Sequence, residues 1–230
     1  MVVEAPPIRP VRSLLSQLPE HLSANLFNGA APVHIATDES LFATGDAGDG
    51  CYRIEQGLLK VAMQSRLGAE RILAFLGPGA IVGELSIIDG LPRSASVVAM
   101  RASVLSFLSR QAFEDFTGKH PDVYKSLVVL LAARLRETDA VVAASSFLPM
   151  RGRIARTLLE LAENFGQDVG SDRVVIRQKF GQNDIGAMTG ISRENVSRIL
   201  NDWKRRKLVS RLSGYYCLEN KVKLQAEGEL

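Results

Sequence analysis

Residues 192–198 read Ser-Arg-Glu-Asn-Val-Ser-Arg, and this stretch decides how the carboxy-terminal third of the chain folds. Ser192 is a favourable helix cap, because its hydroxyl can accept a hydrogen bond from a free amide of the first turn. Arg193, Glu194 and Arg198 then share one broad face of the helix that follows. An arginine fork matches the acceptor pair of guanine, and a glutamate accepts from the amino group of cytosine. This face predicts contact with the DNA major groove; the alternative is a solvated helix with a Glu194–Arg198 ion pair.

The neighbouring residues favour DNA contact. Residues 182–188, beginning with Gln182, predict a short first helix, and Gly190 supplies a turn before the second helix. This is the helix-turn-helix arrangement. Residues 208–218 form a two-strand pattern about Ser213-Gly214, which predicts a β-hairpin wing, and the basic run 203–207 would meet phosphates. We therefore predict a winged helix-turn-helix over residues 151–220.

Length and charge indicate a second domain with another task. The 230 residues are enough for two modest domains, each with its own core. Residues 1–150 contain 13 Lys and Arg against 15 Asp and Glu, whereas residues 151–230 contain 15 against 10. A basic region that holds a helix-turn-helix fits a nucleic acid partner. We therefore expect residues 1–150, which are slightly acidic, to bind something else or to regulate the DNA-binding region.

The composition also sets expectations about location and cysteine chemistry. No apolar run approaches the ~18 residues of a membrane span, and residues 1–13 lack the apolar centre of a signal peptide. We expect a cytoplasmic protein that does not enter a membrane. Cys51 and Cys217 stand far apart in strand-like surroundings, so we expect both to be core residues rather than ligands, and no metal.

Residues 33–108 predict an all-β roll. Short apolar segments are separated by glycine-containing turns at intervals of about 8–12 residues, which is typical of β-sandwiches and rolls. The overall fold class is therefore α+β, with a β-roll domain at 16–120 after a flexible tail at 1–15.

One segment of the roll carries residues suited to a nucleotide. The backbone amides of Gly83, Glu84, Leu85 and Ser86 can form a nest for an anion, Arg93 can form a fork onto a phosphate, and Ser94 can donate a hydroxyl. A glutamate repels a bare phosphate but suits a ribose hydroxyl, so an anion beside a sugar is indicated. The alternative is an ordinary turn with an Arg93–Glu84 salt bridge.

Residues 122–146 predict one long helix with a dimer seam. Seven residues recur at spacings of 4, 3, 4, 3, 4 and 3, a 3.5-residue repeat typical of a two-stranded coiled coil. They are Tyr124, Val128, Leu131, Leu135, Thr138, Val142 and Ser145. A homodimer helix over 121–146 is the preferred interpretation, and a buried core helix is the alternative. Pro149 ends the helix, so 147–150 is predicted to be a hinge, and 221–230 a second tail.

From about residue 20 to 218 the chain resembles the cyclic-AMP receptor protein/fumarate–nitrate regulator (Crp/Fnr) family of bacterial transcription regulators. The segments that carry the resemblance are Gly83-Glu84-Leu85 with Pro92-Arg93-Ser94-Ala95, and residues 192–198. The resemblance implies cyclic AMP as an allosteric ligand, with Glu84 on the ribose 2′-hydroxyl and Arg93 and Ser94 on the cyclic phosphate. It also implies a homodimer that reads a palindromic double-stranded DNA site with half-sites like TGTGA, and it leaves RNA polymerase open as a further partner.

Further site residues follow from the same resemblance. Arg134 matches a phosphate ligand, and Thr138 matches the first of two hydroxyl residues that hold adenine. Asp139 replaces the expected serine, and we hypothesise that this carboxylate favours adenine over guanine. The alternative is a solvated charge that weakens the contact with a purine. The DNA-contacting set is Gln182, Ser192, Arg193, Glu194, Asn195, Ser197 and Arg198.

Other functions have less support in the sequence. The three histidines stand far apart without a nucleophile or paired carboxylates, which argues against an enzyme. An iron–sulphur sensor needs about four thiolates, and this chain has two cysteines. A Crp/Fnr-type regulator that senses haem, another metabolite or no small ligand remains the alternative, as does a module that regulates a protein partner.

Overall fold

The computed structural model describes residues 25–228, without the side chains of residues 130, 133, 134, 137, 140–147 and 228. The described residues form two compact units, one up to Thr138 and one from Asp139 onward. The tail predicted at residues 1–15 lies outside the described residues.

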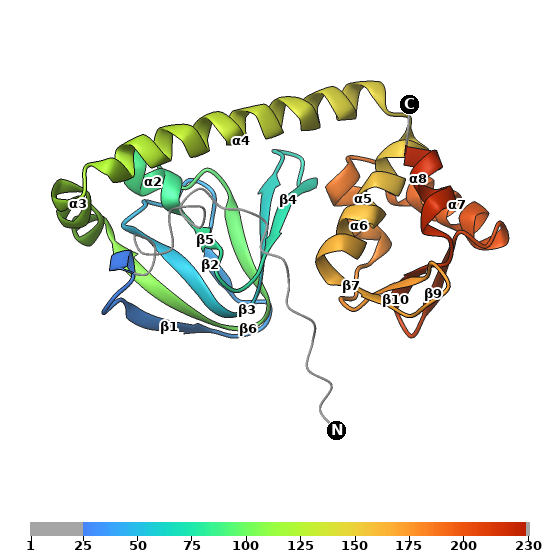
Figure 1. Cartoon of the computed structure of the whole chain (residues 1–230), viewed down its shortest axis with the longest axis horizontal. Helices are drawn as coiled ribbons and strands as arrows, with labels where there is room; N and C mark the ends of the chain where they lie inside the picture. The colour runs from blue at the N-terminus through green and yellow to red at the C-terminus, as the bar shows by residue number, and fades with distance from the viewer. Residues whose placement is uncertain (1–24, 229–230) are drawn as a thin grey trace. The chain divides into compact units, whose positions relative to one another are not determined.

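The first unit is an antiparallel β-roll (Figure 1). Its strand order is β1-β6-β3-β4, with β2 paired to β6 and β5 paired to β3. The strands are β1 (Ala31–Ile35), β2 (Ser40–Phe42), β3 (Gly50–Gln64), β4 (Glu70–Leu76), β5 (Ile81–Val82) and β6 (Ser96–Ser109). Apolar side chains from β3, β4 and β6 fill the interior, among them Ile54, Leu59, Leu76, Val97 and Leu105. This confirms the predicted β-roll over residues 33–108, although the region is not all-β, because a short helix forms at Glu84–Asp89.

Three helices accompany the roll: α2 (Glu84–Asp89), α3 (Arg110–Lys119) and α4 (Asp122–Phe147). A second apolar cluster joins them, in which Ile87 of α2 and Phe113 of α3 meet Val123 and Leu127 of α4. Cys51 lies in the same cluster and is fully buried, as expected for a core cysteine. The short helix that carries the candidate ligand residues is thus packed against the start of the long helix.

Helix α4 has two different faces in the first unit. Val123 and Leu127 are buried against the roll. The first four residues of the predicted seam are instead exposed: Tyr124 by 52%, Val128 by 65%, Leu131 by 39% and Leu135 by 63%. An apolar stripe with this regular spacing remains uncovered within the chain, so the alternative of a fully buried core helix does not fit this part of α4.

The second unit combines helices with a small sheet. Its helices are α5 (Met150–Phe165), α6 (Gln182–Thr189), α7 (Arg193–Arg205) and α8 (Lys221–Gly228), and its strands are β7 (Gly166–Asp168), β8 (Val174–Ile176), β9 (Val209–Leu212) and β10 (Tyr215–Leu218). The sheet order is β7-β8-β10-β9. Ser213 and Gly214 have φ angles of 51° and 89°, the left-handed turn that favours a tight hairpin. The predicted helix-turn-helix and wing are therefore present.

Two features of the second unit differ from the prediction or add to it. Residues 221–230 were predicted to be a tail, but α8 forms there, because Leu224 is fully buried and Glu227 bonds to neighbouring helices. Strands β7 and β8 were not predicted, since three-residue strands leave little periodicity in a sequence.

The break between α4 and α5 falls at Leu148-Pro149, within the predicted segment 147–150. No described helix has the length and apolarity that a membrane crossing requires.

Candidate ligand cavity and nucleic-acid interface

A cavity of about 170 Å³ lies in the first unit beside α2. Six predicted ligand residues line it: Gly83, Glu84, Leu85, Ser86, Arg93 and Ser94. Apolar side chains complete its wall, among them Phe42, Val61, Leu73, Leu76 and Val97. The fold thus brings together two parts of the sequence motif around one partly apolar space.

Gly83 shapes the polar end of this cavity. It precedes α2 with φ of 82°, a left-handed conformation that glycine adopts without a Cβ penalty. A Cβ at this position would lie 2.4 Å from Nη1 of Arg93. Only glycine therefore satisfies the backbone conformation and also leaves room for the guanidinium.

Arg93 is fixed from inside the protein, with 3% of the residue exposed. Its Nη1 donates to the carbonyls of Gly50 at 2.7 Å and Gly83 at 2.8 Å, and its Nη2 donates to Asp49 at 3.3 Å. The guanidinium carbon also lies 4.3 Å from the centre of the Phe42 ring. Asp49, which the sequence analysis did not select, is thus the carboxylate that pairs with this arginine.

The Arg93 guanidinium is the group at the cavity that suits an anion. The buried Nε atom of Arg93 has no hydrogen-bond partner in the described chain, and a buried donor of this kind usually has one. Burial raises the pKa of the nearby Cys51 thiol, with Glu84 adding to the effect, so that thiol stays neutral. A fixed guanidinium, an exposed hydroxyl on Ser94, the Glu84 carboxylate and an apolar wall fit a ligand with both an anion and an apolar ring.

The remaining predicted ligand residues belong to α4. Thr138 and Asp139 are exposed, and the side chain of Arg134 is outside the described ones. The roles of all three in ligand binding stay predictions.

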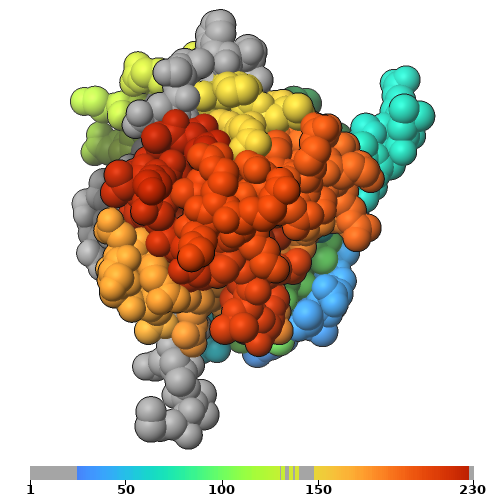
Figure 2. Space-filling model, turned by 90° about the vertical axis from the view of Figure 1, so that its right-hand side faces the viewer, coloured from blue at the N-terminus to red at the C-terminus, as the bar shows by residue number. Residues whose placement is uncertain are grey.

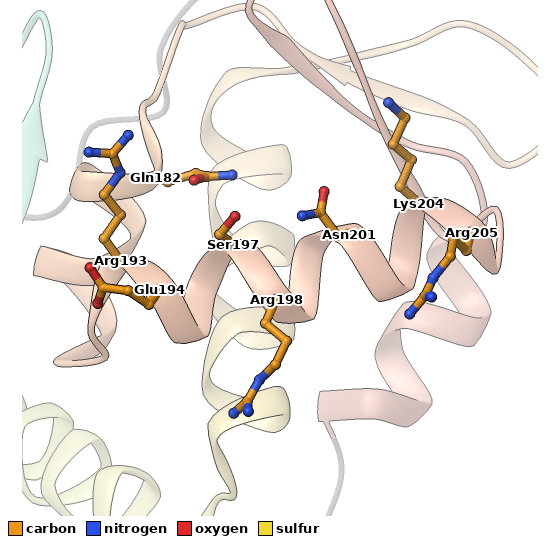
Figure 3. A pocket seen from close by; sticks show the side chains of 8 residues that line it. All are labelled: Gln182, Arg193, Glu194, Ser197, Arg198, Asn201, Lys204 and Arg205. Atoms are coloured by element: carbon orange, nitrogen blue, oxygen red, sulfur yellow. The ribbon is translucent and has the colours of Figure 1, made fainter.

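A second candidate site lies on α7, where an open hollow of about 1130 Å³ is formed (Figure 3). It is lined by Gln182, Arg193, Glu194, Ser197, Arg198, Asn201, Lys204 and Arg205. Ser192 caps α7, its hydroxyl accepting from the Asn195 amide at 3.4 Å, as predicted. Opposite the hollow, Val196, Ile199, Leu200 and Trp203 are buried. In the space-filling view, the orange-red surface of the second unit faces the viewer (Figure 2).

The charged groups of α7 are available for recognition. The Arg198 guanidinium donates to Oδ1 of Asn195 at 2.8 Å, so this contact, and not the Glu194–Arg198 ion pair of the alternative interpretation, holds it among the described residues. The backbone amide of Glu194 and the Ser192 hydroxyl hold the pKa of the exposed Glu194 carboxyl below its usual value, with a smaller contribution from Arg193. Glu194 is therefore ionised and able to accept a hydrogen bond from a base.

Three residues of the hollow were not in the predicted base-reading set: Asn201, Lys204 and Arg205. Of these, Lys204 and Arg205 belong to the basic run 203–207 that was predicted to meet phosphates. In Figure 3, Asn201 and Lys204 follow Ser197 along one side of α7, with Gln182 of α6 nearby. Steps of four and three residues from Ser197 place them on one helical face, so the 3.6-residue period could have identified them.

The described residues contain no group of three or more His, Cys, Asp or Glu that could hold a metal ion. The chemistry that the two sites offer is anion binding in the roll and polar contact with base edges and phosphates at α7.

Comparison with known proteins identifies a domain family for each of the two regions that contain these sites. Residues 32–120 match the model of the cyclic nucleotide-binding domain, and residues 152–227 match the model of the Crp-like helix-turn-helix domain. The chain is 33% identical over 199 residues to the CRP-like cAMP-activated global transcriptional regulator of Mycobacterium tuberculosis, covering 86% of this chain and 85% of that protein. It is 34% identical over 172 residues to the cAMP-activated global transcriptional regulator CRP of Escherichia coli, covering 74% and 81%.

Among solved structures, the c-di-GMP responsive global regulator CLP of Xanthomonas campestris has the same fold. The TM-score is 0.75 at 19% identity, covering 88% of this chain and 100% of that one.

Proposed function

The chain belongs to the Crp/Fnr family of transcription regulators, and from that premise we propose that it is a homodimer whose binding to a palindromic DNA site is controlled by cyclic AMP. Family membership makes it a DNA-binding regulator with a cyclic-nucleotide-binding domain. The ligand, the dimer and the operator are the parts that we propose.

The observation that carries the ligand proposal is the buried guanidinium of Arg93 at the wall of the cavity. A cyclic nucleotide supplies a phosphate for Arg93 and Ser94 and a ribose hydroxyl for the Glu84 carboxylate. The apolar wall suits the remaining uncharged surface of the ligand. Relatives that are named as activated by cyclic AMP support this choice over other anions.

The dimer proposal depends on the uncovered stripe of α4. Apolar residues at alternating steps of four and three are the seam of a two-stranded coiled coil, and a second copy of α4 would cover them. Two copies would also supply two α7 helices, as a palindrome requires, with half-sites one DNA turn or about 34 Å apart. A ligand controls such a dimer only by binding one arrangement of the pair more tightly than the other.

A regulator that answers another ligand is the alternative, and it follows if the Asp139 carboxylate stays solvated and weakens the contact with a purine instead of selecting adenine. A carboxylate stands here where the family resemblance leads us to expect a serine, so the contact with the base would change from donor to acceptor. A regulator described as c-di-GMP responsive has a similar fold, which supports testing a nucleotide other than cyclic AMP.

Calorimetric titration of the purified protein with cyclic AMP, cyclic GMP and cyclic di-GMP tests the proposal. We expect saturable binding of cyclic AMP at micromolar concentration and weaker binding of cyclic GMP. Saturation by cyclic di-GMP alone would establish the alternative, and no heat with any of the three would remove cyclic nucleotides from the account.

A further inference from the structure

Helix α8 packs as an integral part of the second unit. Leu224 is fully buried, and the Glu227 side chain is only 15% exposed. A Cβ added to Gly152 of α5 would lie 3.4 Å from the Glu227 carbonyl, so the backbones of α5 and α8 approach each other closely here.

The Glu227 carboxylate holds the last turns of the recognition helix α7. It accepts from the indole Nε1 of Trp203 at 3.1 Å and pairs with Arg206 at 2.5 Å. Trp203 is fully buried, and Arg206 is the C-cap residue that follows the last residue of α7. Hydrogen bonds from a buried indole and a guanidinium to one carboxylate are strong and directional, because the acceptor is charged.

The same network reaches the start of α5. Arg151 lies 3.6 Å from Glu227 and donates to Asp202 of α7 at 2.9 Å. The Arg151 guanidinium, by this hydrogen bond, is the main cause of the lowered pKa of Asp202, so the Asp202 carboxyl stays ionised. Arg151 follows Pro149 by two residues, so α7 is tied to the point at which α5 begins.

We propose that α8 is a positioning element for DNA reading, and that the Glu227 carboxylate sets the orientation in which α7 presents its side chains to the major groove. This inference rests on the proposed DNA-reading role of α7. The base-reading residues Arg193, Glu194 and Arg198 lie in the amino-terminal half of α7, whereas Glu227 contacts Trp203 and Arg206 at its carboxy-terminal end. Because α7 is a rigid rod, a small tilt at the anchored end displaces the reading side chains, and recognition tolerates only about 0.5 Å of displacement.

The first part of the test needs no DNA. Glu227→Ala removes the carboxylate while alanine keeps α8 favourable as a helix. Glu227→Gln keeps an acceptor for the indole but loses the charge. The matched control is Glu163→Ala, the same change at an exposed residue of α5. We expect faster amide hydrogen exchange in α7 and α8 of Glu227→Ala, with β8 and β10 unchanged, an intermediate effect in Glu227→Gln, and none in the control.

Fluorescence gives a second reading of the same contact, since Trp203 is the chain's one tryptophan. We expect its emission to become easier to quench with acrylamide in Glu227→Ala. Unchanged exchange in α7 together with unchanged quenching would overturn the proposal.

The second part measures DNA affinity at a temperature well below unfolding of every variant. The probes are a duplex with two TGTGA half-sites one helical turn apart and a scrambled duplex of equal length. Glu227→Ala should weaken binding to the half-site duplex about tenfold, because a tilted α7 would lose about one good base contact. Binding to the scrambled duplex should not weaken, because the phosphate-contacting charges are intact.

The outcomes separate the two claims. An equal loss on both duplexes would mean that α8 serves stability alone, and the proposal would be wrong. If the wild-type protein does not prefer the half-site duplex, the proposed DNA site fails, and the exchange and quenching results then decide whether α8 positions α7.

Discussion

Replacing Arg93 by leucine removes the donors that join three segments of the roll at the ligand cavity. Nη1 donates to the carbonyls of Gly50 and Gly83, at 2.7 and 2.8 Å, and only 3% of the arginine is exposed. Leucine would leave both acceptors without this partner, at about 1–3 kcal/mol each. Part of that cost is offset because a buried guanidinium no longer has to be desolvated.

We therefore expect a net loss of about 2 kcal/mol in the free energy of unfolding, which for a chain of this size lowers Tm by about 4–8 °C. Ligand affinity should fall further, by at least about a hundredfold, because a forked and charged contact with the phosphate is lost. Arg93→Lys keeps the charge but not the planar fork, so it should be intermediate in both properties.

Thermal unfolding followed by circular dichroism and calorimetric titration with cyclic AMP measure the two effects separately. The control is Arg66→Leu, the same substitution at an exposed residue between β3 and β4. If Arg93→Leu bound cyclic AMP as tightly as the control, Arg93 would not be the phosphate ligand. An unchanged or raised Tm would show that its internal hydrogen bonds contribute nothing net.

Four further predictions concern single substitutions in α4, in α7 and at the ligand cavity. Leu135→Glu should give a monomer by sedimentation velocity, because it buries charge in the proposed seam, whereas Val129→Glu, one step off the seam, should not; a Leu135→Glu dimer would refute the seam. Asp139→Ser should lower the ratio of cyclic-AMP to cyclic-GMP affinity measured by calorimetry, and an unchanged ratio would remove Asp139 from ligand choice. Arg198→Lys should reduce discrimination for guanine by about 1–3 kcal/mol while leaving the salt dependence of binding unchanged, and retained discrimination in a panel of mutated duplexes would contradict its role as a base reader. Gly83→Ala should lower Tm and weaken ligand binding, because the added Cβ would lie 2.4 Å from a guanidinium nitrogen; wild-type behaviour in both assays would show that this fit is not needed.

The sequence was sufficient to predict those features of the structure that depend on one residue and its immediate neighbours. Ser192 has the chemistry of a helix cap and caps α7, and Pro149 interrupts the helical pattern where α4 gives way to α5. The chemistry of Gly83 and Arg93 predicted that they share an anion site; the fold places both at one cavity, and anion binding stays a prediction. In each case the decisive residue acts on its immediate neighbours or belongs to a compact motif.

The sequence was not sufficient where long-range contacts determine the outcome. Helix α8 has too little apolar periodicity to predict, because its stability comes from burial of Leu224 and from the bonds of Glu227 to α7. The Arg93–Asp49 pair joins residues 44 positions apart, and no local pattern selects that aspartate. For the same reason Arg198 could be placed on the correct face, while its bond to Asn195 and not to Glu194 required the side-chain geometry.

Fluorescence anisotropy of a labelled duplex, titrated with the protein in the presence and absence of cyclic AMP, tests the central claim most directly. The duplex carries two TGTGA half-sites one helical turn apart, and the salt concentration is held fixed. The account predicts that saturating cyclic AMP tightens binding at least about tenfold on this duplex, and that Arg93→Leu abolishes the response. Equal affinity with and without the nucleotide would contradict it, leaving a DNA-binding member of the family that cyclic AMP does not control.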